Sequence, residues 1–265
     1  MSNRPEVRRV RHETRFRRLT VSRVERLTPA LLRVALAGGE LQGFISLGFD
    51  DHVKLIFPPA DGGELVVPGP SLPEGTPRPM MRDYTPRRYD EATGELLIDF
   101  VIHDAGPATT WAAAAAPGQV LGVGGPRGSM IIPTEFDWHL LIGDETALPA
   151  IGRRLEELPP TTRALVVAEV DSETDHIAFD SPASVQVIWA YRRGNPPGTP
   201  EPMLSALRAV AFPSGEYFAW AAAETQVARA IRKYLIDERQ ADKQYIKAAG
   251  YWQRGVMGAH ERIED

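Results

Sequence analysis

The second half of the chain alternates apolar runs with helical segments, and this alternation restricts the fold more than any other feature. The apolar runs lie at residues 138–144, 163–170, 185–194 and 217–224. Such nearly uninterrupted runs are typical of strands buried on both faces of a parallel sheet. Segments with helical periodicity lie at residues 147–158, 203–210 and 225–239. The pattern predicts βαβ units and a doubly wound parallel α/β domain over residues 136–265, with ligands at the carboxyl ends of its strands.

The first half of the chain alternates apolar and polar residues, which is the habit of β-strands. The alternating runs lie at residues 15–28, 31–38, 51–59 and 94–103, with glycine and proline between them. Several short strands with turn signals predict a β-sandwich or β-barrel over residues 15–135. One alanine-rich helix, predicted over residues 107–118, interrupts the strands. We therefore expect a β domain followed by an α/β domain, with a cleft between two cofactor sites.

Composition excludes several classes of protein. The chain has no cysteine, which rules out disulfides, thiolate metal sites, iron–sulfur clusters and cysteine nucleophiles. A net charge of −5 does not favour nucleic-acid binding. Neither a membrane-spanning apolar run nor a signal-peptide core is present, so we predict a cytoplasmic protein. No metal-binding motif and no surplus apolar helix face stand out, so we predict no metal site and a monomer.

A short strand near residue 82 carries side chains suited to a flat, phosphorylated ligand. Arg82 offers a permanent charge and a fork for phosphate, Tyr84 a ring for stacking and Thr85 a hydrogen-bonding hydroxyl. From these residues alone, an exposed edge strand with a salt-bridged arginine is the slightly better interpretation.

A strand–turn–helix unit follows at residues 99–111. The strand places three side chains on one face, namely Asp99, Val101 and His103. The helix then starts with Ala108, Thr109 and Thr110, where unpaired N–H groups and the positive helix dipole can bind phosphate. Simple helix capping by threonine or aspartate is the alternative, and the two interpretations are compatible.

The α/β half lacks the glycine fingerprint of dinucleotide-binding folds. Asp144 and Glu145 occupy the turn after its first strand, and two carboxylates repel a pyrophosphate. Arg192 and Arg193 end the third strand, where they could meet a 2′-phosphate and favour NADPH over NADH. An exposed basic turn is the alternative. Arg127, at the tip of a glycine-rich turn, is a further candidate for anion binding.

Several motifs together identify a family that the chain resembles. They lie, in this order, at residues 82–87, 99–112, 125–129, 141–151, 221–235 and 245–255. The ordered set is similar to the siderophore-interacting protein family, a bacterial branch of the ferredoxin-reductase-like flavoenzymes, over about residues 15 to 260. The resemblance implies an antiparallel Greek-key β-barrel that binds FAD, followed by a doubly wound α/β domain that binds NAD(P)H.

The resemblance also implies roles for individual residues of the β domain. Arg82 would meet the flavin phosphates, and Tyr84 and Thr85 would contact the isoalloxazine and ribityl groups at the catalytic centre. The flavin would be flanked by Asp99, Val101 and His103. Its pyrophosphate would bind the helix start at Ala108, Thr109 and Thr110.

The remaining implied roles concern the second domain and the substrate. Three residues of the turn after its first strand would approach the cofactor, namely Asp144, Thr146 and Ala147. Lys54 and Arg127 would attract an anionic ferric chelate.

The implied activity is ferric-siderophore reduction. NADPH would reduce FAD, and the flavin would pass single electrons to Fe(III) in a siderophore, releasing Fe(II) for iron assimilation. NADH or a reduced ferredoxin remains open as the electron donor. The alternatives are a general NAD(P)H:flavin oxidoreductase with another acceptor, a non-catalytic siderophore carrier and a flavin-binding sensor.

Overall fold

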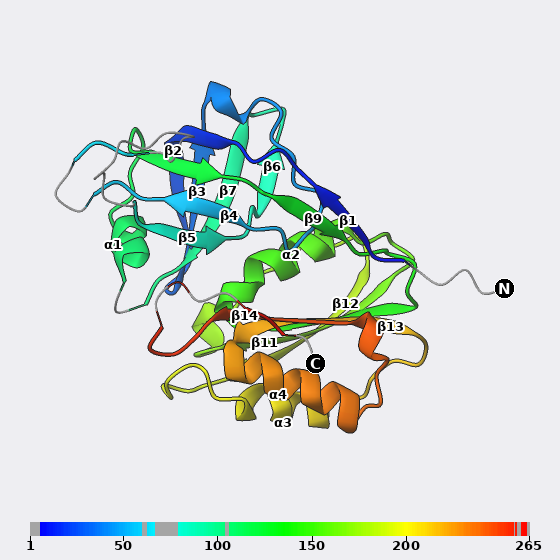
Figure 1. The fold of residues 1–265 in the computed structure, drawn as a ribbon. Coiled ribbons are helices and arrows are strands. Elements are labelled where there is room, and N and C mark those ends of the chain that lie inside the picture. Colours follow the sequence, from blue (N-terminus) through cyan, green and yellow to red (C-terminus); the bar gives the residue numbers. More distant parts are fainter. Residues whose placement is uncertain are drawn as a thin grey trace. The chain divides into compact units, whose positions relative to one another are not determined.

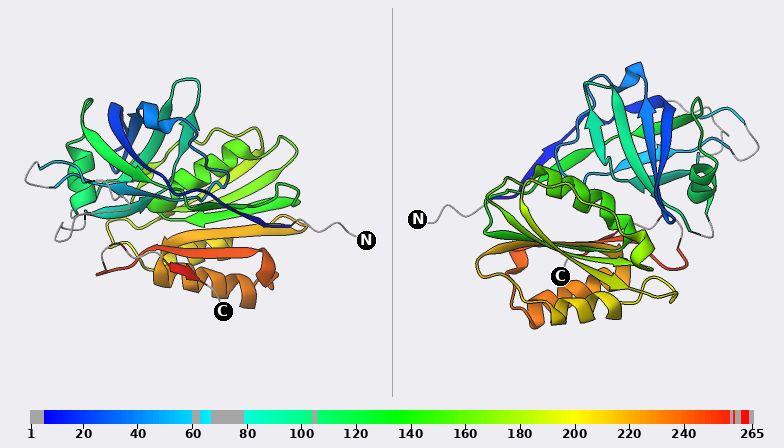
Figure 2. Two further views of the ribbon diagram at one scale, coloured as in Figure 1. Left: turned by 45° about the horizontal axis from the view of Figure 1, so that its top comes forward. Right: turned by 180° about the vertical axis from the view of Figure 1, so that it is seen from behind.

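The structure is a computed structural model that describes residues 6–59, 63–66, 79–103, 106–256, 258 and 261–263. The chain forms two compact units. One consists of residues 7–132, and the other of residues 133–265 together with the first six residues. Figure 1 labels most of their helices and strands, and Figure 2 gives two further views. Among the described residues, no helix is both long and apolar enough to cross a membrane.

The unit of residues 7–132 is built from antiparallel strands. They are β1 (Arg8–Arg11), β2 (Phe16–Thr28), β3 (Leu31–Ala37), β4 (Val53–Ile56), β5 (Met81–Tyr84), β6 (Arg88–Asp90), β7 (Glu95–Val101), β8 (Val120–Gly124) and β9 (Gly128–Ile131). Seven of them form one sheet in the order β5-β4-β8-β2-β3-β7-β6, while β1 pairs with β9. Alternate residues of the sheet bury a core that includes Val34, Leu55 and Phe100. The alternation seen in the sequence therefore gave the correct secondary structure here.

The seven-stranded sheet is strongly curled. Its two edge strands, β5 and β6, are joined by only three residues, 85–87. Tyr84 on β5 also packs against Phe100 on β7, five strands away in the sheet order, with ring centroids 4.5 Å apart. In the described part of the chain no hydrogen-bonded ladder joins β5 to β6. The sheet is thus rolled so that its edges approach each other through side chains and a short link.

Helix α1 (Pro107–Ala113) is shorter than the helix predicted over residues 107–118. Gly106 precedes it with φ 142°, and Pro107 takes the first helical position, where a missing N–H costs nothing. The helix ends before Ala114, which has φ −101°. Alanine favours helix, yet the Pro117–Gly118 pair requires the chain to turn. The last alanines before this pair therefore belong to the turn rather than to the helix.

The second unit contains a mixed six-stranded sheet. Its strands are β10 (Trp138–Gly143), β11 (Arg163–Val170), β12 (Ser184–Tyr191), β13 (Tyr217–Glu224), β14 (Ile246–Trp252) and β15 (Glu261–Ile263). The order is β12-β11-β10-β13-β14-β15, and all pairs are parallel except β14 with β15. The apolar runs of the sequence thus form parallel strands, as predicted.

Helices cover both faces of this sheet. Helix α2 (Leu148–Glu157) lies on one face, and α3 (Glu201–Ala209) and α4 (Thr225–Asp237) lie on the other (Figures 1 and 2). The strand order reverses at β10, which lies between β11 and β13. At such a reversal the carboxyl ends of the strands form a crevice suited to ligands.

Candidate cofactor, nucleotide and substrate sites

An aromatic column forms the first feature of the site in the unit of residues 7–132. The ring of Tyr84 packs on that of Phe100. The ring centroids of Phe100 and Trp111 lie 5.7 Å apart, and those of Trp111 and Phe57 lie 5.6 Å apart. Phe57 and Phe100 are buried, whereas Tyr84 and Trp111 are partly exposed. Burial raises the pKa of Tyr84, so its phenol stays neutral and able to donate a hydrogen bond. The column therefore offers a rigid aromatic surface with a polar tip.

Strand β5 presents Arg82 and Tyr84 on one face, because alternate residues of a strand point the same way. Their partners across the ladder, Leu55 and Val53, are both buried. The guanidinium of Arg82 is partly exposed and donates from Nη1 to the carbonyl of Met81 at 2.8 Å. Thr85 follows directly and is buried, at 8% exposure. The structure thus brings the three predicted residues together at the sheet edge.

The start of α1 lies beside His103. A Cβ added at Gly106 would lie 3.4 Å from Cε1 of His103. Ala108 and Thr109 are buried, while Thr110 donates from its backbone N (2.9 Å) and its hydroxyl (3.1 Å) to the carbonyl of Gly106. The hydroxyl of Thr110 thus serves the helix itself. Among the described residues no side chain caps this helix start, so capping by threonine is not supported and the phosphate site stays a prediction.

The prediction that His103 shares a strand face with Asp99 and Val101 is wrong, because β7 ends at Val101 and His103 is exposed beyond it. Asp99 is buried and accepts hydrogen bonds from Nε and Nη2 of Arg33 at 2.7 and 2.8 Å. The two residues face each other across the β3–β7 ladder. Arg33 was not among the predicted site residues, because a register between distant strands cannot be seen in the sequence.

Lys54 lies on β4 next to β5, and its Nζ donates to Oδ2 of Asp83 at 2.6 Å. The pair lies on the face of the β4–β5 ladder opposite to Arg82 and Tyr84, as strand alternation requires. The side chain of Lys54 is 42% exposed and that of Asp83 is 16% exposed. Arg127 is exposed in the link between β8 and β9. Lys54 is therefore accessible to solvent but already paired with a carboxylate.

The turn after β10 is fixed by Asp144. Its Oδ1 accepts from the backbone N and the hydroxyl of Thr146 at 3.0 and 2.5 Å. Its Oδ2 accepts from Nε1 of Trp252 at 2.8 Å and from the backbone N of Glu224 at 3.2 Å. Burial, helped by the charge of Glu145, raises the pKa of Asp144 to about 6. Asp144 therefore holds together the ends of β10, β13 and β14.

Gly143 and Ala147 complete this turn. A Cβ at Gly143 would lie 2.2 Å from Cβ of Ala147 and 2.6 Å from the carbonyl of Ala222, so only glycine lets the chain pass here. Ala147 is fully buried, while Thr146 is partly exposed. Of the residues Asp144, Thr146 and Ala147 predicted to approach the cofactor, Thr146 is the most accessible.

Arg192 is enclosed by carboxylates at the carboxyl ends of the strands. Its Nη1 donates to Glu145 Oε2 at 2.8 Å and to Glu169 Oε1 at 3.3 Å, and its Nη2 donates to Glu145 Oε1. Burial works against the charge of Arg192, but the hydrogen bonds and charge of Glu145 raise its pKa overall. Burial and the charge of Asp144 raise the pKa of Glu169 to about 7, against the pull of Arg192. Arg193 is exposed, with φ 52°.

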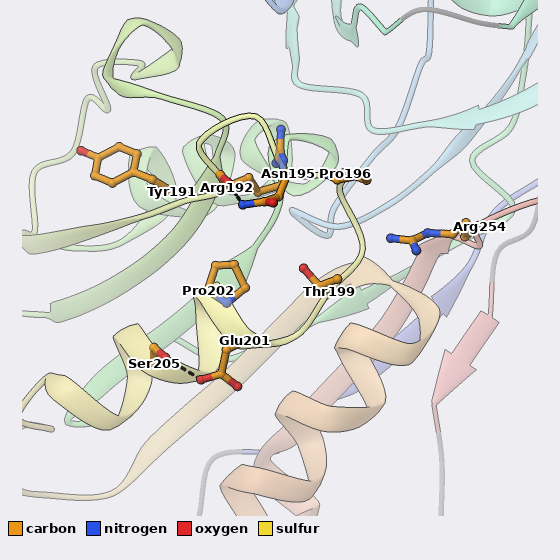
Figure 3. Close-up of a pocket in the computed structure, with 9 residues that line it drawn as sticks. All are labelled: Tyr191, Arg192, Asn195, Pro196, Thr199, Glu201, Pro202, Ser205 and Arg254. Carbon is orange, nitrogen blue, oxygen red and sulfur yellow. Dashed lines mark hydrogen bonds between the residues drawn. The ribbon is translucent and has the colours of Figure 1, made fainter.

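A pocket of about 520 Å³ opens beside Arg192 (Figure 3). The loop between β12 and α3 and the first turn of α3 line it, and Arg254 lines it from the segment after β14. Arg254 donates to the carbonyl of Pro197 in that loop. Glu201 and Ser205, one turn apart on α3, are hydrogen-bonded to each other at 2.7 Å. The pocket thus combines two arginines with polar groups at a strand-end position suited to a nucleotide.

Glu169 and Glu224 were missed by the sequence analysis. Glu224 is the one charged residue of β13, and Glu169 shares β11 with only one other charge, the exposed Arg163 at its start; both glutamates are buried in strands that are otherwise almost entirely apolar. A buried charge requires a partner, so an isolated carboxylate in such a strand is a usable signal.

Comparison with known proteins decides the family. Residues 136–255 match the siderophore-interacting protein family, and residues 20–130 match the siderophore-interacting FAD-binding domain family. The chain belongs to the siderophore-interacting protein family. Among its relatives is an Escherichia coli protein named NADPH-dependent ferric-chelate reductase, 40% identical over 263 residues, covering 95% of this chain and 99% of the relative. A ferric vibriobactin reductase of Vibrio cholerae is 35% identical over 232 residues, covering 85% of this chain and 84% of the relative.

Solved structures agree with this assignment. A siderophore utilization protein from T. fusca matches with a TM-score of 0.89 and 40% identity, covering 96% of this chain and 98% of that one. A ferredoxin NADP+ reductase from Neisseria gonorrhoeae matches with a TM-score of 0.54 and 14% identity, covering 84% and 91%, which bears on the fold alone. The family resemblance found in the sequence is therefore confirmed.

Proposed function

We propose that this protein is an NADPH-dependent ferric-siderophore reductase that uses FAD. The observation that carries the proposal is the full-length 40% identity to a protein named NADPH-dependent ferric-chelate reductase, within a family described as siderophore-interacting. The activity predicted from the sequence and FAD as cofactor are both in agreement with these relatives.

The residues around Tyr84 fit a flavin. The aromatic column offers a surface on which a planar ring can stack, and the neutral Tyr84 hydroxyl can donate to it. Arg82 supplies a partly exposed positive charge for phosphate on the same face of β5. In the proposal Tyr84 and the buried Thr85 position the ring, and the start of α1 contributes N–H groups of Ala108 and Thr109 to the pyrophosphate. Thr110 and His103 border that start.

Two assigned residues have structural partners that define their part in the proposal. Asp99, held by Arg33, supports β7 from the opposite face to Phe100 and keeps Val101 and the following residues in place. Asp144 and Ala147 shape the turn after β10 and leave Thr146 to approach a ligand.

When bound, FAD supplies the redox chemistry, accepting two electrons as a hydride from NADPH and releasing them singly to Fe(III). The iron is substrate and stays on its chelate until reduced; hard oxygen ligands then hold Fe(II) less tightly. Lys54 and Arg127 give positive potential that attracts an anionic chelate. Arg192 and Arg193, at the end of β12, are assigned to NADPH. A hydride carries two electrons, so each NADPH reduces two ferric chelates.

We also infer that the curled sheet is a Greek-key barrel and that the second unit is a doubly wound nucleotide domain. The three-residue link between the edge strands supports the first inference. Helices on both faces of the mixed sheet support the second. The domains are assigned to residues 15–135 and 136–265. A monomer acting in the cytoplasm, where NADPH is available, completes the proposal.

The test is anaerobic and follows the flavin absorbance. NADPH should bleach the FAD-loaded protein, and a ferric siderophore should restore the absorbance with two ferric ions consumed per NADPH. An iron-free siderophore is the control. If ferric siderophores fail to reoxidise the reduced protein while a non-metal acceptor succeeds, the protein is a general flavin oxidoreductase and the proposal is wrong.

A further inference from the structure

The Arg192 cluster has more carboxylates than its cation can balance. Glu145 binds the guanidinium through both oxygens, and Glu169 contacts it through one. The second oxygen of Glu169 and Nε of Arg192 are buried without a hydrogen-bond partner in the described part of the chain. Glu169 is 1% exposed and Arg192 is 8% exposed. Buried polar atoms without partners are rare, and here they mark a site that is incomplete by itself.

The surrounding strands add further negative charge. Asp144 precedes Glu145, and Glu224 ends β13, accepting hydrogen bonds from the first turn of α4 and, at 3.4 Å, from the backbone N of Arg254. The side chain of Arg254 lies in the pocket and bonds to Pro197. Within the described ranges, Arg192 is therefore the cation that directly contacts Glu145 and Glu169, and Asp144 and Glu224 add negative charge to the cluster.

Arg192 also lines the pocket beside the β12–α3 loop, which is where the proposed function requires the nucleotide phosphate to bind. A phosphate and a carboxylate use the same planar fork of an arginine. As the structure stands, Glu145 occupies that fork.

We propose that Glu145 is an internal competitor for Arg192 and that NADPH binds by displacing its carboxylate with the 2′-phosphate. This inference rests on the proposed function and assigns Glu145 as a residue that sets nucleotide affinity through Arg192. Displacement leaves the Glu145 carboxylate beside Asp144 and Glu169 without its ion pair, and the phosphate then neutralises Arg192 in place of Glu145. Such a group of carboxylates cannot remain fully ionised in a buried site, so it takes up a proton.

Nucleotide binding is therefore coupled to proton uptake. If one proton is taken up, the affinity for NADP+ rises by up to about tenfold for each unit by which pH falls. The raised pKa of Glu169, about 7, and of Asp144, about 6, place this uptake in an accessible range. NAD+, which lacks the 2′-phosphate, leaves Glu145 on Arg192 and takes up no proton.

The experiment is calorimetric titration of the oxidised, FAD-loaded protein with NADP+ and with NAD+ at pH 7.5–8.5. In that range the 2′-phosphate is fully ionised and does not itself titrate. Buffers of different ionisation enthalpy report the protons bound. The wild-type protein should take up close to one proton with NADP+ and none with NAD+. Equal proton uptake for both nucleotides, or none with NADP+, overturns the inference even if no variant folds.

Variants test the competitor directly. Glu145→Gln should bind NADP+ about tenfold more tightly, with proton uptake lost and NAD+ affinity unchanged, because the competing charge is gone. In an Arg192→Gln background the same substitution should have no effect on NADP+ affinity. Glu157→Gln, which removes the partner of Arg153 on α2 at 2.9 Å, is the matched control and should bind as the parent does. Unchanged or weaker NADP+ binding by folded Glu145→Gln overturns the inference.

The proposed reductase function can be tested separately from the role of Glu145. Chemically reduced protein needs no nucleotide, so its reoxidation by a ferric siderophore tests the function without Arg192. Reoxidation together with no NADP+ binding would keep the function, assign it another electron donor and overturn the role of Glu145.

Discussion

Replacing Asp83 by asparagine is expected to improve the reduction of anionic ferric chelates. Asp83 accepts a hydrogen bond from Nζ of Lys54 at 2.6 Å, and its negative charge cancels most of the electrostatic potential that Lys54 would exert on an approaching anion. A unit charge about 7 Å from a bound anion is worth about 0.6 kcal/mol in a water-like medium, or roughly a threefold change in KM per unit of chelate charge. Asp83→Asn should therefore lower KM about threefold for a monoanionic chelate and more for a trianionic one, whereas Lys54→Ala should raise it by a similar factor.

The assay is steady-state ferric reduction with a neutral and an anionic chelate, at low and at high ionic strength. At about 1 M salt the Debye length falls to about 3 Å, so both effects should largely disappear. The neutral chelate is the control, because its KM should be nearly the same in all three proteins. An Asp83→Asn protein that leaves the KM for the anionic chelate unchanged, or that alters both chelates equally, would show that Lys54 does not act through its charge.

Three further predictions concern cofactor binding and stability. Arg82→Ala should release FAD about 10- to 100-fold more readily, because a charge-assisted phosphate contact is worth about 1.5–3 kcal/mol; equal FAD fluorescence titrations of variant and parent would refute the contact. Burial, helped by the charge of Arg154, lowers the pKa of the fully buried His139 to about 3, while the unfolded chain binds this proton near pH 6.5. The parent therefore loses stability as pH falls below about 6.5, because the buried His139 stays neutral while the unfolded chain is protonated. Below that pH, the free energy of unfolding of His139→Leu should rise relative to the parent by about 1.4 kcal/mol per unit fall in pH. A difference in urea unfolding that does not change with pH would contradict this. Gly143→Ala should cost about 1–3 kcal/mol by overpacking, and Ala147→Gly in the same chain should recover part of the loss; a melting temperature equal to that of the parent would show that the turn can shift.

The main elements of the fold could be predicted because each depends on neighbouring residues. The strand of residues 217–224 is almost wholly apolar, and the structure buries it between two parallel neighbours. The strand of residues 16–28 alternates, and the structure buries its alternate side chains near its start. The helix after Gly106 was predicted too long because helix propensity depends only on nearby residues, and the alanine run continues beyond Ala113. The turn that ends the helix is instead determined by the position of the next strand.

The ion pairs at the sites could not be predicted, because they join strands that are distant in the sequence. Arg33 meets Asp99 only because of the β3–β7 register. Lys54 meets Asp83 in the same way across β4 and β5. A residue type in a sequence shows which charge is available, whereas the register decides whether another residue has already neutralised it. A predicted binding arginine or lysine should therefore be checked first for a carboxylate opposite.

The nucleotide end of the second unit shows why this check changes the function inferred. In the sequence, Glu145 is a carboxylate that repels phosphate and Arg192 is a cation that attracts it. In the structure the two neutralise each other, so the repulsion and the attraction are both smaller than the sequence suggests. Phosphate can therefore bind Arg192 only if the displaced Glu145 carboxylate is neutralised in another way. In a buried cluster beside Asp144 and Glu169, the carboxylates are neutralised by taking up a proton. Discrimination between NADPH and NADH in this protein should consequently depend on pH, with NADPH favoured most strongly at the acid end of the working range.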